Sequence, residues 1–159
     1  MSNRKGQMNS IDLMMAILIF VILIVFVIGF WFVEQKEIQS TLTKNRLEAE
    51  AISISDILIK SPGNPSDWEK NQSEIKMLGL AIEGNVLSDA KISNFTNMSY
   101  SSAQNYLGLD DQFYFYIENM NGNRLYQFGN NTFGDQVIVI TRFAVLNGEK
   151  ILMRVSVYE

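Results

Sequence analysis

The chain has no cysteine and no histidine among its 159 residues, and only two prolines. Without cysteine there is no disulfide framework and no thiolate metal site. Without histidine, the commonest general base and the commonest zinc ligand are both missing. We therefore expect no catalytic residues, no metal site and no cofactor, and we do not expect an enzyme.

Basic residues are also scarce. The chain holds 13 Lys and Arg against 17 Asp and Glu, a net charge of −4 at pH 7. Residues 34–159 alone hold 11 basic and 16 acidic residues. Because a nucleic-acid backbone attracts clustered Lys and Arg, this balance argues against a nucleic-acid partner. It is typical of a solvent-exposed surface.

A long apolar segment, Leu13–Val33, contains 21 residues without a charge. As a helix it would span roughly 31 Å, about the thickness of the hydrocarbon core of a bilayer. The segment exceeds the apolar part of a secretory signal, and no small-residue cleavage site follows Val33, so we expect it to stay in the mature protein. Arg4 and Lys5 precede it, which places the N-terminus in the cytoplasm and residues 34–159 outside.

Asp12 immediately precedes the apolar segment. An ionised carboxylate at the edge of the hydrocarbon costs several kcal/mol unless a partner compensates it. A plain membrane anchor does not need such an acid. Asp12 is therefore either a residue that awaits a cationic partner or an acid favoured by the dipole at a helix N-terminus.

Helical signals continue beyond the apolar segment, since Glu34–Lys60 contains no proline or glycine. Apolar residues at Leu47, Ala51, Ile54 and Leu58 step by four, three and four, the spacing of one helix face. The segment Ser61-Pro62-Gly63-Asn64-Pro65 then ends the helix. We predict one helix from about residue 10 to residue 60, apolar in its first half and amphipathic in its second.

The C-terminal third predicts strands. Phe113–Ile117 and Arg124–Phe128 flank the turn signal Asn121-Gly122, and Gln136–Val145 and Lys150–Tyr158 flank Asn147-Gly148. On one face of the second pair we expect Val137, Val139, Thr141, Phe143 and Val145, and the partner strand repeats the alternation at Ile151, Met153, Val155 and Val157. The predicted fold class is α+β, with a four-stranded, mainly antiparallel sheet packed on the amphipathic half of the helix.

A few single residues invite a functional interpretation. Four Asn-x-Ser/Thr sequons are candidate N-glycosylation sites on an exported surface, at Asn71, Asn94, Asn97 and Asn130. The pair Asp110-Asp111 is better explained as a solvated turn than as an acid/base site. Trp68 is expected in the core beside the proline-rich turn. The tyrosines Tyr114, Tyr116 and Tyr126 are expected to pack across strands rather than to bind glycans.

The leader carries a family resemblance. Arg4-Lys5-Gly6-Gln7 followed by Ser10-Ile11-Asp12-Leu13 resembles the leader and mature start of archaeal type IV pilin-like proteins with a class III signal peptide. The resemblance implies that a prepilin peptidase cuts between Gly6 and Gln7. That family places the acid at the fifth mature position, whereas Asp12 would be the sixth; a cut after Gln7 would restore the fifth position.

A second pattern resembles the region after the long helix in the same family. It comprises Ser61-Pro62-Gly63-Asn64-Pro65-Ser66-Asp67-Trp68, Gly79-Leu80-Ala81, Leu87-Ser88 and Lys91. Archaellins share the leader type, but their helices are richer in Gly, Ala and Thr, so the pilins fit better.

The resemblance implies a type IV pilin-like fold with four parts. These are a cleaved signal peptide (1–6), an apolar membrane and filament-core helix (7–33), an amphipathic continuation (34–61) and an extracellular β-rich domain (62–159). It implies a major or minor pilin that serves adhesion, held in the cell membrane as a precursor and then assembled into a homo-oligomeric surface filament. The implied partners are the prepilin peptidase, the membrane and other pilins.

Within the filament, Asp12 would pair with the new amino terminus and so act in assembly. Two alternatives stay open. One is a single-pass anchored surface domain that never polymerises, and the other is a surface enzyme.

Overall fold

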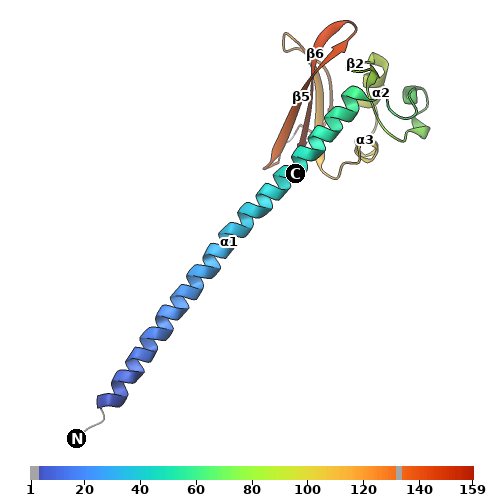
Figure 1. The fold of residues 1–159 in the computed structure, drawn as a ribbon. Helices are drawn as coiled ribbons and strands as arrows, with labels where there is room; N and C mark the ends of the chain where they lie inside the picture. The colour runs from blue at the N-terminus through green and yellow to red at the C-terminus, as the bar shows by residue number, and fades with distance from the viewer. Residues whose placement is uncertain (1–3, 132–133) are drawn as a thin grey trace. The chain divides into compact units, whose positions relative to one another are not determined.

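The computed structural model describes residues 4–131 and 134–159, and the side chains of residues 4–10, 36 and 37 are outside that description. The chain forms two compact units, Met1–Thr43 and Lys44–Glu159. The long helix α1 (Arg4–Lys60) contributes to both, as the blue-to-green ribbon of Figure 1 shows. Each unit is described by itself below.

Helix α1 begins six residues before the predicted Ser10. Residues 4–9 contain no proline, and their one glycine, Gly6, costs only about 1 kcal/mol in a helix. Extending an existing helix adds a hydrogen bond for each residue, so the helix continues back to Arg4. Its C-terminal end agrees with the prediction, because the Ser61 amide still donates to Ile57 and Pro62 then ends the helix.

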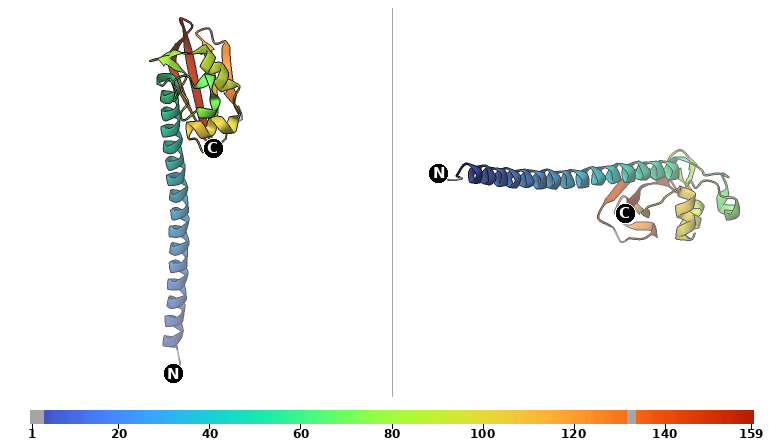
Figure 2. Two further views of the ribbon diagram at one scale, coloured as in Figure 1. Left: turned by 90° about the vertical axis from the view of Figure 1, so that its right-hand side faces the viewer. Right: turned by 90° about the horizontal axis from the view of Figure 1, so that it is seen from below.

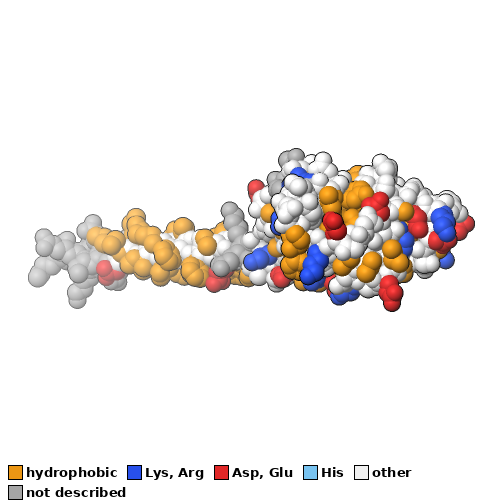
Figure 3. All heavy atoms as spheres, turned by 90° about the horizontal axis from the view of Figure 1, so that it is seen from above, with side chains coloured by type: hydrophobic (Ala, Val, Ile, Leu, Met, Phe, Trp, Pro, Cys, Tyr) orange, Lys and Arg blue, Asp and Glu red, His pale blue; other side chains and the backbone are white. Residues whose placement is uncertain are grey.

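The part of α1 in the first unit is apolar and unburied. Every described side chain from Ile11 to Gln35 is exposed, and hydrophobic side chains cover this segment (Figure 3). Among the described residues, α1 is the one helix long and apolar enough to cross a membrane, judged by length and composition alone. A signal sequence near an N-terminus can meet the same criteria of length and composition.

The second unit builds its core on the last turns of α1. The predicted face is confirmed: Leu47, Ala51 and Leu58 are fully buried, and Ile54 is 2% exposed. They pack in one core cluster with Phe113, Phe115, Ile117, Met153, Val155 and Val157 of the sheet. The amphipathic spacing therefore positions a sheet against one face of the helix.

The sheet has six strands in the order β1-β2-β5-β6-β3-β4. The four predicted strands are confirmed as two antiparallel hairpins joined through β3 and β6. They are β3 (Gln112–Asn119), β4 (Arg124–Gly129), β5 (Val137–Leu146) and β6 (Glu149–Tyr158).

Two short strands, β1 (Ala81–Glu83) and β2 (Val86–Leu87), were not predicted as part of the sheet. β2 runs parallel to β5, with Val86 opposite Val145, so the sheet is mixed rather than purely antiparallel. Three- and two-residue strands carry too little alternation to stand out in a sequence. They exist because β1 pairs with β2 and β2 pairs with β5, which satisfies their backbone groups.

Helices cover one face of this sheet. Beside the last turns of α1 lie α2 (Asp89–Thr96) and α3 (Tyr100–Leu107), which Figure 2 shows over the strands. Ser88 and Ser99 cap them by accepting hydrogen bonds from backbone amides, and Gly108 ends α3 in the left-handed conformation. Phe95 of α2 meets Phe115 edge to face, with ring centroids 5.2 Å apart.

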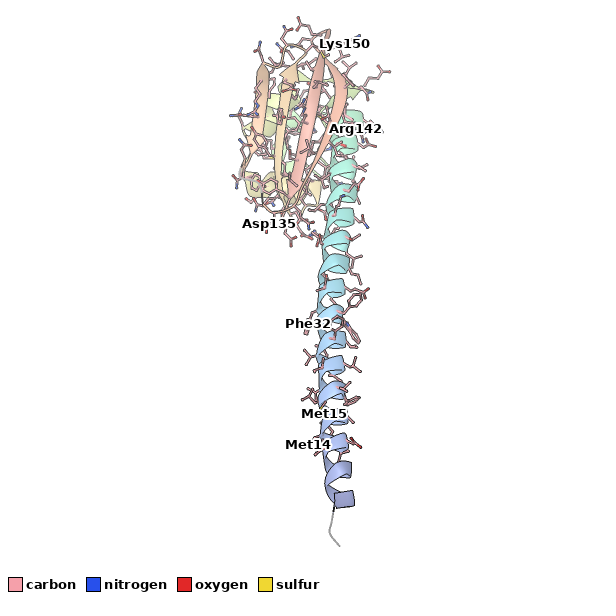
Figure 4. All side chains as sticks on the ribbon, turned by 90° about the vertical axis from the view of Figure 1, so that its left-hand side faces the viewer. Met14, Met15, Phe32, Asp135, Arg142 and Lys150 are labelled. Atoms are coloured by element: carbon pink, nitrogen blue, oxygen red, sulfur yellow. The ribbon has the colours of Figure 1, made fainter. Side chains whose placement is uncertain are left out.

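The two alternating sets of the second hairpin lie on opposite faces. The register pairs Ile138 with Val157 and Ile140 with Val155, so the even-numbered residues of β5 share the covered face with the odd-numbered residues of β6. Val137, Val139, Thr141 and Phe143 are exposed on the other face. Arg142, which Figure 4 labels, belongs to the even-numbered set of β5 and pairs with Asp56 of α1 at 2.8 Å.

Candidate functional site

The apolar part of α1 presents a hydrophobic surface on all sides. Phe26 is 75% exposed and even Ile24, among the less exposed, is 40% exposed. A shallow hollow lies around Gly29, where a Cβ would meet nothing within 4 Å. So much apolar surface is unfavourable in water.

Asp12 lies in α1 at the start of this surface and is exposed. It forms no ion pair with any residue whose side chain the structure describes. Gly6 and Gln7 belong to the helical backbone, but the Gln7 side chain lies outside the described part. The cut at Gly6–Gln7 and the pairing of Asp12 with a new amino terminus therefore stay predictions.

The residues of the second pattern meet at the C-terminal end of α1. We call Ser61, Gly63, Trp68, Gly79 and Lys91 the helix-end cluster. Leu80 donates its amide to the Leu58 carbonyl at 2.9 Å, and Ala81 donates to the Ser61 carbonyl at 3.1 Å. The last carbonyls of a helix lack partners within the helix. The segment 79–81 supplies those partners and so attaches the rest of the unit to the helix.

Trp68 holds the centre of the cluster, and its predicted place in the core is confirmed. It is fully buried in the 3-10 turn η1 (Trp68–Lys70), before η2 (Gln72–Glu74), and its indole donates to the Gly79 carbonyl at 2.8 Å. Gly63 has φ +87°, and a Cβ there would strike the Trp68 ring. The tight turn at Gly63 and the close passage at Gly79 therefore both require glycine.

Lys91, in α2, is the last member of the helix-end cluster. The residue is 4% exposed, and its ammonium donates to the carbonyls of Pro62 at 2.6 Å and Ala81 at 3.2 Å. Burial lowers the Lys91 pKa, although Glu69 and Asp67 oppose the shift. The lysine therefore fastens the loop after α1 to β1, and with both carbonyls bound it is a structural group rather than an available nucleophile.

Replacing Lys91 by methionine should destabilise the second unit by about 1–3 kcal/mol, because the buried Ala81 carbonyl and the part-buried Pro62 carbonyl lose their donor. Urea unfolding of the full chain in detergent micelles, followed by tryptophan fluorescence, measures the change. Lys76→Met removes an exposed lysine and is the matched control. Equal stability of the two variants would contradict the role given to Lys91.

Three sequons differ in their setting. Asn71 lies in an exposed turn, where its Oδ1 accepts from the Ser73 hydroxyl at 2.7 Å within the same sequon. Asn94 lies in α2, half-buried, with its amide donating to the Ala90 carbonyl at 2.9 Å. Asn97 is exposed at the C-terminal cap of α2. For Asn130, the backbone carbonyl accepts from the Tyr158 hydroxyl at 2.6 Å, and the threonine of its sequon lies outside the described residues.

We expect a glycan on Asn71 and none on Asn94 when the protein is exported by a cell that glycosylates sequons. The glycan attaches to the side-chain amide, and that of Asn94 is held in a helix whose next residue, Phe95, is fully buried. Mass spectrometry of glycopeptides measures occupancy at each sequon. Asn71→Gln should remove the modification, while a glycan on Asn94 would contradict the expectation.

The remaining residues of interest are structural. Asp111 pairs with Arg46 of α1, whereas Asp110 is exposed, so the two acids do not act together. Partial burial, with Asp111 nearby, raises the pKa of Glu50 even though Arg46 bonds to it. No group of three or more acidic side chains that could hold a metal ion occurs among the described residues.

The three tyrosines do not form one surface. Tyr114 and Tyr116 lie on the face of the sheet away from the helices, with ring centroids 5.6 Å apart, and Tyr114 is buried. Tyr126 lies on the covered face, where its hydroxyl donates to Asp89 of α2 at 2.6 Å, and this bond raises its pKa. The strand register therefore places Tyr126 on the opposite face of the sheet from Tyr114 and Tyr116, although the three are close in sequence.

Comparisons with known proteins identify no relative. No protein-family model, no curated protein and no solved structure matches the chain.

Proposed function

We propose that this protein is a pilin-like structural subunit of an archaeal type IV pilus-like surface filament, major or minor, that serves adhesion. One observation carries the proposal: an apolar helix exposed on all sides directly follows Asp12 and the leader Arg4-Lys5-Gly6. A membrane anchor accounts for the helix alone. Assembly accounts for the acid and the leader together.

The chemistry of assembly starts with proteolysis. Cutting after Gly6 removes Arg4 and Lys5 and leaves a free amino group on Gln7. That amino group, from the same copy or a neighbour, neutralises Asp12 within a bundle of apolar helices. Leaving a buried ion pair half-made costs roughly 3–5 kcal/mol, so the pair selects the register in which helices stack.

The apolar helix can leave the bilayer at low cost when copies of itself replace the lipid. Lipid tails and apolar side chains are similar environments, so this exchange does not oppose the hydrophobic effect. The helix lacks a small-xxx-small motif, so its packing uses bulky side chains on several sides. The second unit, held to α1 by its core and the helix-end cluster, would then form the filament surface that meets other cells or materials.

The decisive experiment is the intact mass of the protein purified from membranes and from sheared surface material. The proposal expects Gln7 as the first residue, with Met8 as the alternative cut. A chain that retains Met1 or Ser2 in both fractions would favour a single-pass anchored domain, which the length of the apolar helix alone would also support.

Asp12→Ala should reduce the assembled fraction by about 100-fold or more, as expected for loss of an ion pair whose disruption costs roughly 3–5 kcal/mol. Immunoblots of sheared filaments against membranes give the ratio. Asp12→Glu keeps the charge and should retain much of the assembly. Unchanged assembly in the alanine variant would show that the acid serves only the helix dipole.

A further inference from the structure

On the face of the sheet away from the helices, β5 carries an exposed apolar row, whereas Tyr114, Ser156 and Tyr158 of the same face are buried. In Figure 4 the strands face the viewer, and the register places Val137, Val139 and Phe143 of β5 on this face. Phe143 is 67% exposed, Val139 49% and Val137 40%. A solvated face of an antiparallel sheet ordinarily carries polar residues at such positions. An exposed apolar row therefore marks a contact surface.

A shallow hollow extends the apolar row at one end of the sheet. Met120, 57% exposed after β3, lines it with Phe143 and Val145 of β5, and Lys150 of β6 borders it. Leu152, opposite Phe143, continues the apolar surface toward β6. We call this surface, with Arg124, Tyr116 and Arg154 beside it, the open face.

Cations are held in place on the open face. The Arg124 guanidinium lies 4.6 Å from the centroid of the Tyr116 ring and donates to the Tyr114 hydroxyl at 3.1 Å. Arg154 lies 5.6 Å from the same ring centroid and pairs with Glu118 at 2.8 Å. Arg124 forms no ion pair with any described side chain. It is thus a preorganised cation that can still bind a carboxylate bidentately.

The charge of the open face opposes that of the rest of the domain. It carries three basic side chains, Arg124, Lys150 and Arg154, and one acid, Glu118. The other parts of residues 34–159 hold the remaining 8 basic and 15 acidic residues. Two open faces would repel each other, whereas the net-positive open face attracts the remainder of residues 34–159, which is net negative.

We propose that the open face binds the acid-rich surface of a second copy of this chain. Such a contact is heterologous, and repeated heterologous contacts generate open-ended filaments. The inference rests on the proposed filament and names a contact within it that is separate from the apolar helix. Arg124 pairs with a carboxylate of the neighbour while Phe143 and Val139 are buried against it.

The absence of cysteine allows a direct test in the full-length protein. Phe143→Cys, labelled with a benzophenone maleimide on intact surface filaments, should give two-copy adducts whose peptides map outside the open face. Ser101→Cys, on the exposed side of α3 over the opposite face, is the control and should give at least tenfold less. Adding Arg124→Glu to Phe143→Cys should lower the adduct yield at least tenfold.

A third labelled position shows whether the open-face contact fails alone or together with the filament proposal. Ala16→Cys probes copy-to-copy contact along the apolar helix. Adducts at Ala16 without adducts at Phe143 would overturn the open-face contact and leave the filament standing, whereas no two-copy adducts at either position would overturn both. Phe143 adducts that map to the open face itself, to lipid or only to a different protein would also overturn the inference.

Discussion

Cells that carry Gly6→Leu should show no surface filaments, while the protein accumulates in the membrane with its leader attached. A peptidase that cuts after this residue must approach the backbone closely, and glycine is the residue that leaves room for it. The uncut chain keeps Arg4 and Lys5, which favour the cytoplasmic side of the membrane. Drawing those two charges into an apolar helical bundle would cost several kcal/mol each.

Intact mass shows whether the leader is still attached, and electron microscopy shows whether surface filaments form. Asn3→Leu places the same bulk in the leader away from the cut and should mature normally. Filaments made from uncut Gly6→Leu protein would show that proteolysis is not needed for assembly. A mature N-terminus in that variant would instead place the cut elsewhere, with Gln7–Met8 the first bond to inspect.

Gly79→Ala should prevent stable folding of the second unit. A Cβ at this position would fall on the Ser61 carbonyl oxygen and the Gly63 amide nitrogen, both backbone atoms, so no side-chain rotation can relieve the clash. Separating the two segments would break the Trp68–Gly79 hydrogen bond and open a gap beside the buried indole. Truncating a buried tryptophan costs about 3–5 kcal/mol, and we expect a loss of at least that size.

Thermal unfolding and limited proteolysis of the full chain in detergent micelles measure the effect. Gly84→Ala is the matched control, since its Cβ would meet nothing within 4 Å and the only cost is its φ of +53°, about 1–2 kcal/mol. Protease resistance of Gly79→Ala equal to that of Gly84→Ala would mean that the 61–63 and 79 segments do not need this close passage.

The sequence predicted the elements of the fold that depend on local periodicity. The spacing of Leu47, Ala51, Ile54 and Leu58 identified the buried helix face, and the two Asn-Gly turns located both hairpins. The strands β1 and β2 escaped prediction because they form only through pairing with each other and with Val145 and Leu146, nearly 60 residues away.

The orientation of β5 could not be read from its sequence. The odd-numbered set that the sequence singled out is exposed as far as Phe143, and Ile138 and Ile140, which are equally apolar, pack against the core instead. Arg142 suggests solvent on the even-numbered face, where the structure pairs it, half-buried, with Asp56. The open face was missed for this reason. The residues of the helix-end cluster were noted as a pattern, but only the fold shows that Lys91 reaches back to Pro62.

The last turns of α1 also set how the second unit would respond to mechanical tension. Leu58 and Ile59 are embedded in the core, while the Leu58 and Ser61 carbonyls bind the 79–81 segment. A pull that extracts this helix must therefore rupture packing and hydrogen bonds simultaneously rather than peel them apart in sequence. The two kinds of contact thus share any load applied along the last turns of the helix.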